Sequence, residues 1–121
     1  MAEKEMYTAG KPHHIELIPD RSQIKADGKD LSFITVRVVD KDGNLCPLAE
    51  NEISFRVKGA GTYQAGANGN PASLESFQVP KMKVFSGMMT AIVSSTDKPG
   101  RITLEATGRG LVKGILNIES K

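Results

Sequence analysis

The most constraining feature of this sequence is the alternating run SFITVRVVD at positions 32–40. Successive side chains of a β-strand point to opposite faces of a sheet, so Ile34, Val36 and Val38 share one face. The opposite face is mixed and carries Phe33, Thr35, Arg37 and Val39. β-branched residues dominate the run and suit a pleated sheet better than a helix. The run therefore predicts a half-buried strand of an antiparallel sheet.

A tight turn and a second strand follow this run. Asp42, Gly43 and Asn44 suit a turn in which a positive φ costs little. The alternation then resumes, and the side chains predicted to point inward are Ile53, Phe55 and Val57. Because a shift of one residue would expose each apolar set, the register of both strands is well defined.

Shorter alternating segments predict further strands on both sides of this pair. Pro12–Pro19 has a proline at each end, which restricts it to an edge position. Ile24 should continue that edge after a kink, and 26–30 should form a turn. Later strands are expected over 88–95, 101–107 and 111–119. The inward side chains expected in these segments are Ile15, Leu17, Ile24, Met89, Ala91, Val93, Ile102, Leu104, Ala106, Val112, Leu116 and Ile118.

Residues 59–87 break the pattern, because their first part is rich in glycine. We expect a long structured loop there, with one short strand at 83–85. Loops of this length are usually functional or form interaction surfaces.

The whole chain is expected to be all-β. No window sustains an apolar helical stripe with caps at both ends. About seven short antiparallel strands with regular turns predict an immunoglobulin-like β-sandwich over residues 12–121. Residues 1–11 are polar and lack a period, so we expect a flexible lead-in.

Bulk properties exclude several classes of partner. The 121 residues suit one domain, and a net charge of +2 with scattered Lys and Arg argues against nucleic acid. No apolar run is long enough to predict membrane insertion, and the N-terminus lacks the apolar core of a signal peptide. The single cysteine, Cys46, allows no internal disulfide and is expected to be a small, half-buried residue near a turn.

No pattern in the sequence predicts catalysis, a cofactor or a metal. His13 and His14 are adjacent, and neighbouring strand residues should face opposite ways, which disfavours a shared ion. Asp40, Asp42 and Asn44 resemble the start of a calcium loop, but the later ligands of that loop are missing, which favours a hairpin. No pair of carboxylates stands among the aromatic and polar residues that would hold a sugar ring.

A contact surface for a glycan or a neighbouring domain is the remaining candidate site. The aromatic residues near the long loop are Tyr63, Phe77 and Phe85, and their simplest role is to anchor the loop on the sandwich. The residues that we select as candidate contacts are Tyr63, Asn68, Asn70, Glu75 and Phe77.

Two family resemblances appear in this sequence. The segment ADGKDLSFITVRVVDKDGNLCP at 26–47 resembles bacterial immunoglobulin-like repeats of the invasin and intimin type. A longer resemblance, over about 110 residues, is to the C-terminal immunoglobulin-like domain of glycoside hydrolase family 2 enzymes, especially β-galactosidases of the Bacteroides type. It is carried by TAGKP at 8–12, GANGNPASLESFQ at 66–78, KVFSGMMTAIVSS at 83–95 and GRITLEATGRGL at 100–111. Val84 and Ser86 depart from the alanine and asparagine that are more usual in that family.

The longer resemblance implies a non-catalytic accessory domain, because the catalytic glutamates of that family lie on a separate barrel. Its expected partners are the other domains of the parent enzyme, with a glycan as a further candidate. It also implies export of the parent to the periplasm or cell surface. The alternatives are a stalk or adhesin repeat and a carbohydrate-binding module.

Overall fold

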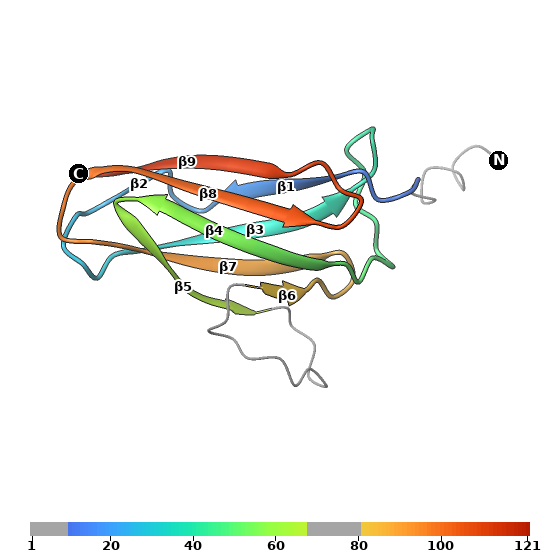
Figure 1. The fold of residues 1–121 in the computed structure, drawn as a ribbon, viewed down its shortest axis with the longest axis horizontal. Helices are drawn as coiled ribbons and strands as arrows, with labels where there is room; N and C mark the ends of the chain where they lie inside the picture. The colour runs from blue at the N-terminus through green and yellow to red at the C-terminus, as the bar shows by residue number, and fades with distance from the viewer. Residues whose placement is uncertain (1–9, 68–80) are drawn as a thin grey trace.

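The computed structural model describes residues 10–67 and 81–121, and they form a β-sandwich of two packed sheets (Figure 1). One sheet, sheet A, has the strand order β1-β3-β7-β5, and the other, sheet B, has the order β2-β9-β8-β4-β6. The expected all-β, immunoglobulin-like sandwich is thereby confirmed. The strands are β1 His14–Pro19, β2 Gln23–Ile24, β3 Leu31–Val39, β4 Glu52–Gly59, β5 Gly61–Ala67, β6 Lys81–Lys83, β7 Met88–Ser95, β8 Gly100–Gly108 and β9 Gly114–Ser120.

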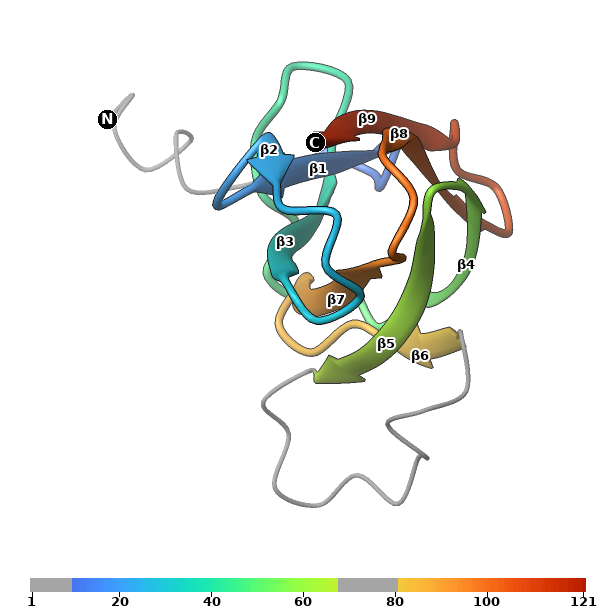
Figure 2. The same cartoon turned by 90° about the vertical axis from the view of Figure 1, so that its left-hand side faces the viewer.

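The core lies between the sheets and is built from the alternating positions. Ile34, Val36 and Val38 of β3 are fully buried, as the period-two pattern predicts. The inward positions of β7 and β8 are also buried, and Ile15, Ile24, Ile53, Phe55 and Ile118 complete the same cluster. Leu17, Val57 and Leu116 are partly buried and pack against it. Viewed along the sandwich, the strands of the two sheets surround the core, and β1 lies beside β9 where the sheets meet (Figure 2).

The expected loop over 59–87 is wrong in its first part, because Gly61–Ala67 forms β5 and pairs with β7. Alternation is absent in β5 because two of its glycines face close neighbours. A Cβ on Gly61 would lie 2.8 Å from Ile102, and one on Gly66 would lie 2.3 Å from the Tyr63 hydroxyl. Packing therefore requires glycine at these two positions. The glycine content of β5 resembles that of a loop, which is why a loop was predicted.

The expected short strand at 83–85 is shifted, since β6 covers Lys81–Lys83 and Phe85 only bridges to Met88. The last strand begins at Gly114, three residues later than expected. Val112 therefore lies before the strand and is 56% exposed, against the expectation that it points inward. The reason is local, because Val112 donates its N–H to the His13 carbonyl instead of joining the ladder of β9.

One pair of strands is parallel, although all pairs were expected to be antiparallel. β2 runs alongside β9, with Gln23 opposite Glu119 and Ile24 opposite Ser120. β1 lies at the edge of sheet A, as its flanking prolines predict. The described residues contain no helix, and so none that is long and apolar enough to cross a membrane.

Candidate functional site

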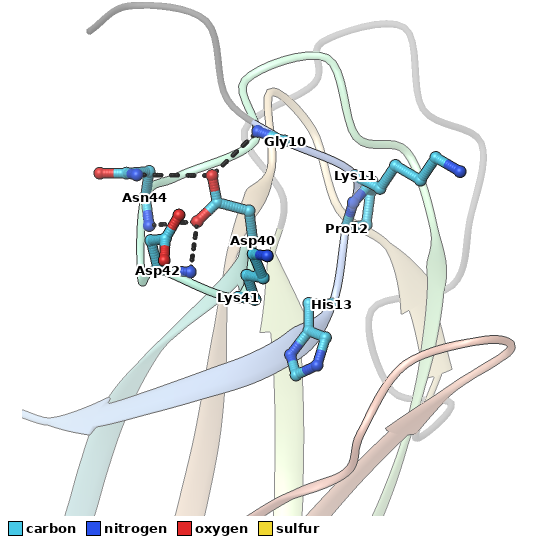
Figure 3. Close-up of a pocket in the computed structure, with 8 residues that line it drawn as sticks. All are labelled: Gly10, Lys11, Pro12, His13, Asp40, Lys41, Asp42 and Asn44. Carbon is cyan, nitrogen blue, oxygen red and sulfur yellow. Dashed lines mark hydrogen bonds between the residues drawn. The ribbon is translucent and has the colours of Figure 1, made fainter.

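A polar cleft of about 680 Å³ lies where the lead-in reaches the sandwich, at the end of β3 (Figure 3). It is formed by the entering chain on one side and by the turn after β3 on the other. Its lining residues are Gly10, Lys11, Pro12, His13, Asp40, Lys41, Asp42 and Asn44. The Asp42-Gly43-Asn44 turn was expected from the sequence, and Gly43 adopts a φ of +87° there.

Asp40 organises this cleft through its carboxylate. Its Oδ1 accepts the backbone N–H groups of Asp42 and Asn44, each at 2.9 Å. Its Oδ2 accepts the N–H of Gly10, also at 2.9 Å. These bonds, with that from Gly10 the largest cause, lower the pKa of Asp40 from 3.8 to about 2. Asp40 is therefore a fixed anion at neutral pH that ties the lead-in to the turn, and it is unsuited to act as a general acid.

The bond from Gly10 to Asp40 was missed by the sequence analysis, because the two residues are 30 positions apart. The available signal was an aspartate two residues before Asp42-Gly43, which is the pattern of an Asx turn. That pattern indicates the local bonds to the turn. It carries no information about a donor from a distant segment.

The two histidines lie differently from the expectation. His13 precedes β1, so the alternation of a strand does not separate the two rings. Their Nδ1 atoms are 2.9 Å apart, and the rings meet edge to face at 5.1 Å. Two ligands alone do not make a metal site, and no group of three His, Cys, Asp or Glu side chains in residues 10–67 and 81–121 is placed to hold an ion.

Cys46 lies near a turn, as expected, but at 4% exposed it is buried and not half-buried. Its Sγ lies 3.6 Å from the Gly10 carbonyl oxygen. Burial, and next the charge of Asp40, raise the pKa of this thiol. The thiol is therefore protonated and shielded, which makes it a poor nucleophile.

Tyr63 is the only candidate contact residue that lies in the described part of the chain. Its ring stacks on Phe55 with the centroids 5.6 Å apart, and its hydroxyl is buried without a hydrogen-bond partner. Burial raises its pKa to about 12. The ring thus packs against the core, as an anchoring role requires, and its contact with a glycan stays a prediction. The other four candidates, Asn68, Asn70, Glu75 and Phe77, lie outside the described residues.

The described carboxylates are used mainly as structural partners. Glu16 pairs with Arg37, Glu105 pairs with Lys58 at 3.4 Å, and Asp30 pairs with Arg21 at 2.6 Å. Hydrogen bonding to Arg21 is the main cause that lowers the pKa of Asp30 to about 2. These three pairs lie on the surface and favour a structural role for their acidic residues.

Comparisons with known proteins find similarity to a small part of several glycosidases. It is 48% identical over all 121 residues to the β-galactosidase BoGH2A of Bacteroides ovatus, of which it spans 14%. A β-glucuronidase of Formosa agariphila is 31% identical over 106 residues, which make up 10% of that protein. A crystal structure of a glycosyl hydrolase family 2 member from Bacteroides cellulosilyticus superposes with a TM-score of 0.91 at 38% identity. That superposition covers 94% of this chain and 15% of the other.

Similarity to intimin extends to the fold alone. The D00-D0 domain of intimin superposes with a TM-score of 0.65 at 19% identity, over 94% of this chain and 50% of that one. The sequence itself matches the family described as glycoside hydrolase family 2 C-terminal domain 5 over residues 15–117. This match covers most of the sandwich, from β1 into β9, and the chain therefore belongs to the glycoside hydrolase family 2 C-terminal domain 5 family.

Proposed function

We propose that this chain is a non-catalytic accessory domain of a larger β-galactosidase-type enzyme of glycoside hydrolase family 2. The observation that carries the proposal is the match to BoGH2A, which extends over the whole chain but only 14% of that β-galactosidase. A segment of this size and fold is an addition to the catalytic part of such an enzyme. Its role is to pack on the rest of the polypeptide and stabilise its architecture.

The geometry of the described residues supports a structural role. Hydrolysis of a glycoside requires two carboxyl groups on either side of the scissile bond, one of which is protonated at working pH. In the polar cleft, Asp40 is held ionised by three backbone N–H groups. Its carboxylate is thus committed to the turn and the lead-in.

The proposed substrate of the complete enzyme is a β-galactoside, because the more similar curated relative is a β-galactosidase. The β-glucuronidase relative shows that the same kind of domain accompanies enzymes for other sugars. We therefore expect the catalytic part of the enzyme, and not this domain, to determine the identity of the sugar.

The test compares the complete gene product, the 121-residue chain alone and the gene product without this chain, with a nitrophenyl β-galactoside as substrate. We expect hydrolysis by the complete polypeptide and none by the 121-residue chain. We expect removal of the chain to lower the thermal stability of the remainder more than its initial rate per folded molecule. Hydrolysis by the 121-residue chain would refute the non-catalytic role, and an inactive complete polypeptide would refute the glycosidase assignment.

A glycan contact and export belong to the same proposal. A glycan contact through Tyr63 and the segment 68–77 predicts retention on a galactan column that is lost in Tyr63→Ala. Export predicts that the complete polypeptide is found in the periplasmic or surface fraction of the cell. Absence of retention on a broad glycan panel, or recovery only with cytoplasmic markers, would contradict the respective expectation.

A further inference from the structure

The outer face of sheet A is apolar, although it points away from the core. Phe33 of β3 pairs with Ile92 of β7, which pairs with Ala65 of β5, and side chains opposite one another share a face. Phe33 is 44% exposed and Met88 is 37% exposed. We call this surface the apolar face, and its residues are Ile18, Phe33, Thr35, Ala65, Met88, Thr90 and Ile92.

Charge is nearly absent from this face. Of the described residues on the outer side of β1, β3, β5 and β7, only Glu16 and Arg37 are charged, and they pair with each other at one end. A sheet that faces water normally carries polar and charged side chains on its outer side. A contiguous apolar surface of this kind marks a site of interaction.

Sheet B provides an internal reference, because its outer face is charged. The outward positions of β4, β8 and β9 carry Arg56, Lys58, Arg101, Glu105 and Glu119. Ile115 is the large apolar side chain among the described outward positions of these three strands, and it is 53% exposed beside Glu105. The apolar character therefore belongs to one side of the sandwich.

The partner that covers the apolar face can be inferred from the polypeptide that lies outside this domain in the relatives. In BoGH2A and in the Bacteroides cellulosilyticus structure, most of the polypeptide lies outside the segment that matches this chain. Here the described chain enters at Gly10, which is bound to Asp40 directly after β3. The preceding polypeptide thus arrives at the end of the strand whose outward side chains form the apolar face.

We propose that the apolar face docks on an apolar, uncharged surface of the polypeptide that precedes this chain in the complete enzyme. The proposal rests on the accessory role given above, and it adds which side of the sandwich is covered. An uncharged partner is required, since a charge placed against Phe33 and Ile92 would lose its water without gaining a counterion. Sheet B remains exposed to solvent.

The experiment uses thiol labelling of two matched variants of the complete polypeptide, Phe33→Cys and Ile115→Cys. Both positions lie within strands and have similar exposure in the sandwich, 44% and 53%. The rate of maleimide addition at each cysteine is read by peptide mass spectrometry and divided by its rate in urea. The native Cys46 is buried and serves as the slow reference.

We expect labelling at Phe33→Cys to be at least tenfold slower than at Ile115→Cys in the complete polypeptide. In the 121-residue chain, after its cooperative unfolding has been checked, the two rates should agree within about twofold. Equal rates in the complete polypeptide would overturn the proposal. Slow labelling of Phe33→Cys in the 121-residue chain would also overturn it, because the face would then be covered without the rest of the enzyme. This holds whether the slow rate is constant, appears only at high protein concentration, or appears only when galactan fragments are added.

A second variant keeps the proposal testable if Phe33→Cys folds poorly. Thr90→Cys lies at the centre of the same face and replaces a small side chain. Its control is Thr103→Cys on the outer side of β8. These labelling rates do not depend on turnover, so a failed docking prediction is distinguishable from a failed glycosidase assignment.

Discussion

On sheet A the outward positions of β3 and β7 carry Phe33 and Ile92, whereas on sheet B those of β4 and β8 carry Arg56 and Glu105. The inner sides of both sheets are alike, with isoleucine, valine and leucine fully buried. The two sheets therefore bury the same kinds of side chain toward the core and present different kinds of side chain on the outside. The difference teaches that burial of the core determines the inner side chains of a sheet and leaves the outer side chains free to suit water or, as we propose for sheet A, a partner surface.

The strongest way to sharpen this comparison is to contrast the two sides of one strand. Ile34→Ala should cost about 2–5 kcal/mol of unfolding free energy in the 121-residue chain, because Ile34 is fully buried. Phe33→Ala, its outward neighbour, should cost less than about 1 kcal/mol there. Urea unfolding measures both losses of free energy, provided that the dependence of the unfolding free energy on urea concentration is the same in the variants. Equal losses would show that Phe33 belongs to the core.

A charge placed on each outer face should separate the two sheets in the complete polypeptide. Phe33→Lys should weaken the docked state by about 1–3 kcal/mol, because the ammonium group would be buried without a partner. Ile115→Lys on sheet B should change it by less than about 0.5 kcal/mol. Thermal unfolding of the complete polypeptide measures the difference. Identical shifts for the two variants would contradict docking by sheet A.

The stability contributed by Asp40 in the polar cleft should respond to acid. The pKa of Asp40 is lowered from 3.8 to about 2 in the folded chain. Its contribution to stability is therefore fully present above about pH 4 and is lost as the pH falls through about 2. Asp40→Asn should flatten the pH dependence of unfolding in that interval. Urea midpoints at several pH values between 2 and 5 provide the measurement. If the urea midpoint of Asp40→Asn depends on pH as steeply as that of the unaltered chain, the hydrogen bonds from Gly10 and the turn do not stabilise the ionised carboxylate.

The smallest effects should come from the ion pairs on the two faces. Arg37 pairs with Glu16 on sheet A, and Lys58 pairs with Glu105 on sheet B. In the 121-residue chain, Glu16→Gln and Glu105→Gln should each cost about 0.2–1 kcal/mol, since exposed ion pairs contribute little. Added salt should reduce both losses. A much larger loss of unfolding free energy in Glu16→Gln that salt does not reduce would show that the Glu16–Arg37 pair is shielded from solvent in the 121-residue chain.

Sequence patterns predicted the inner sides of the sandwich well and its outer sides poorly. Ile34, Val36, Ile102 and Leu104 follow the period of two that burial on one side imposes, and all are buried. Phe33 was seen only as part of a mixed face. Its neighbours Ile92 and Ala65 come from strands far away in the sequence, so their meeting depends on the register of pairing.

The same reason explains the other errors. The glycines of β5 are required by Ile102 and Tyr63, which no local pattern reveals. The parallel pair of β2 and β9 joins segments almost a hundred positions apart. Family resemblance, by contrast, correctly indicated the domain family, because it compares whole segments and does not depend on periodicity.

The places where the described chain enters and leaves have a mechanical consequence. Gly10 lies at the Asp40 end of the sandwich, and Lys121 lies at the opposite end of its long axis (Figure 1). A pull along that axis would drag β1 lengthwise past β3, with six residue pairs resisting. Ladder bonds lie across an antiparallel pair, so they would share the load and yield together instead of opening one by one. The sandwich should therefore resist a pull along its long axis more strongly than a pull that peels β1 away from β3.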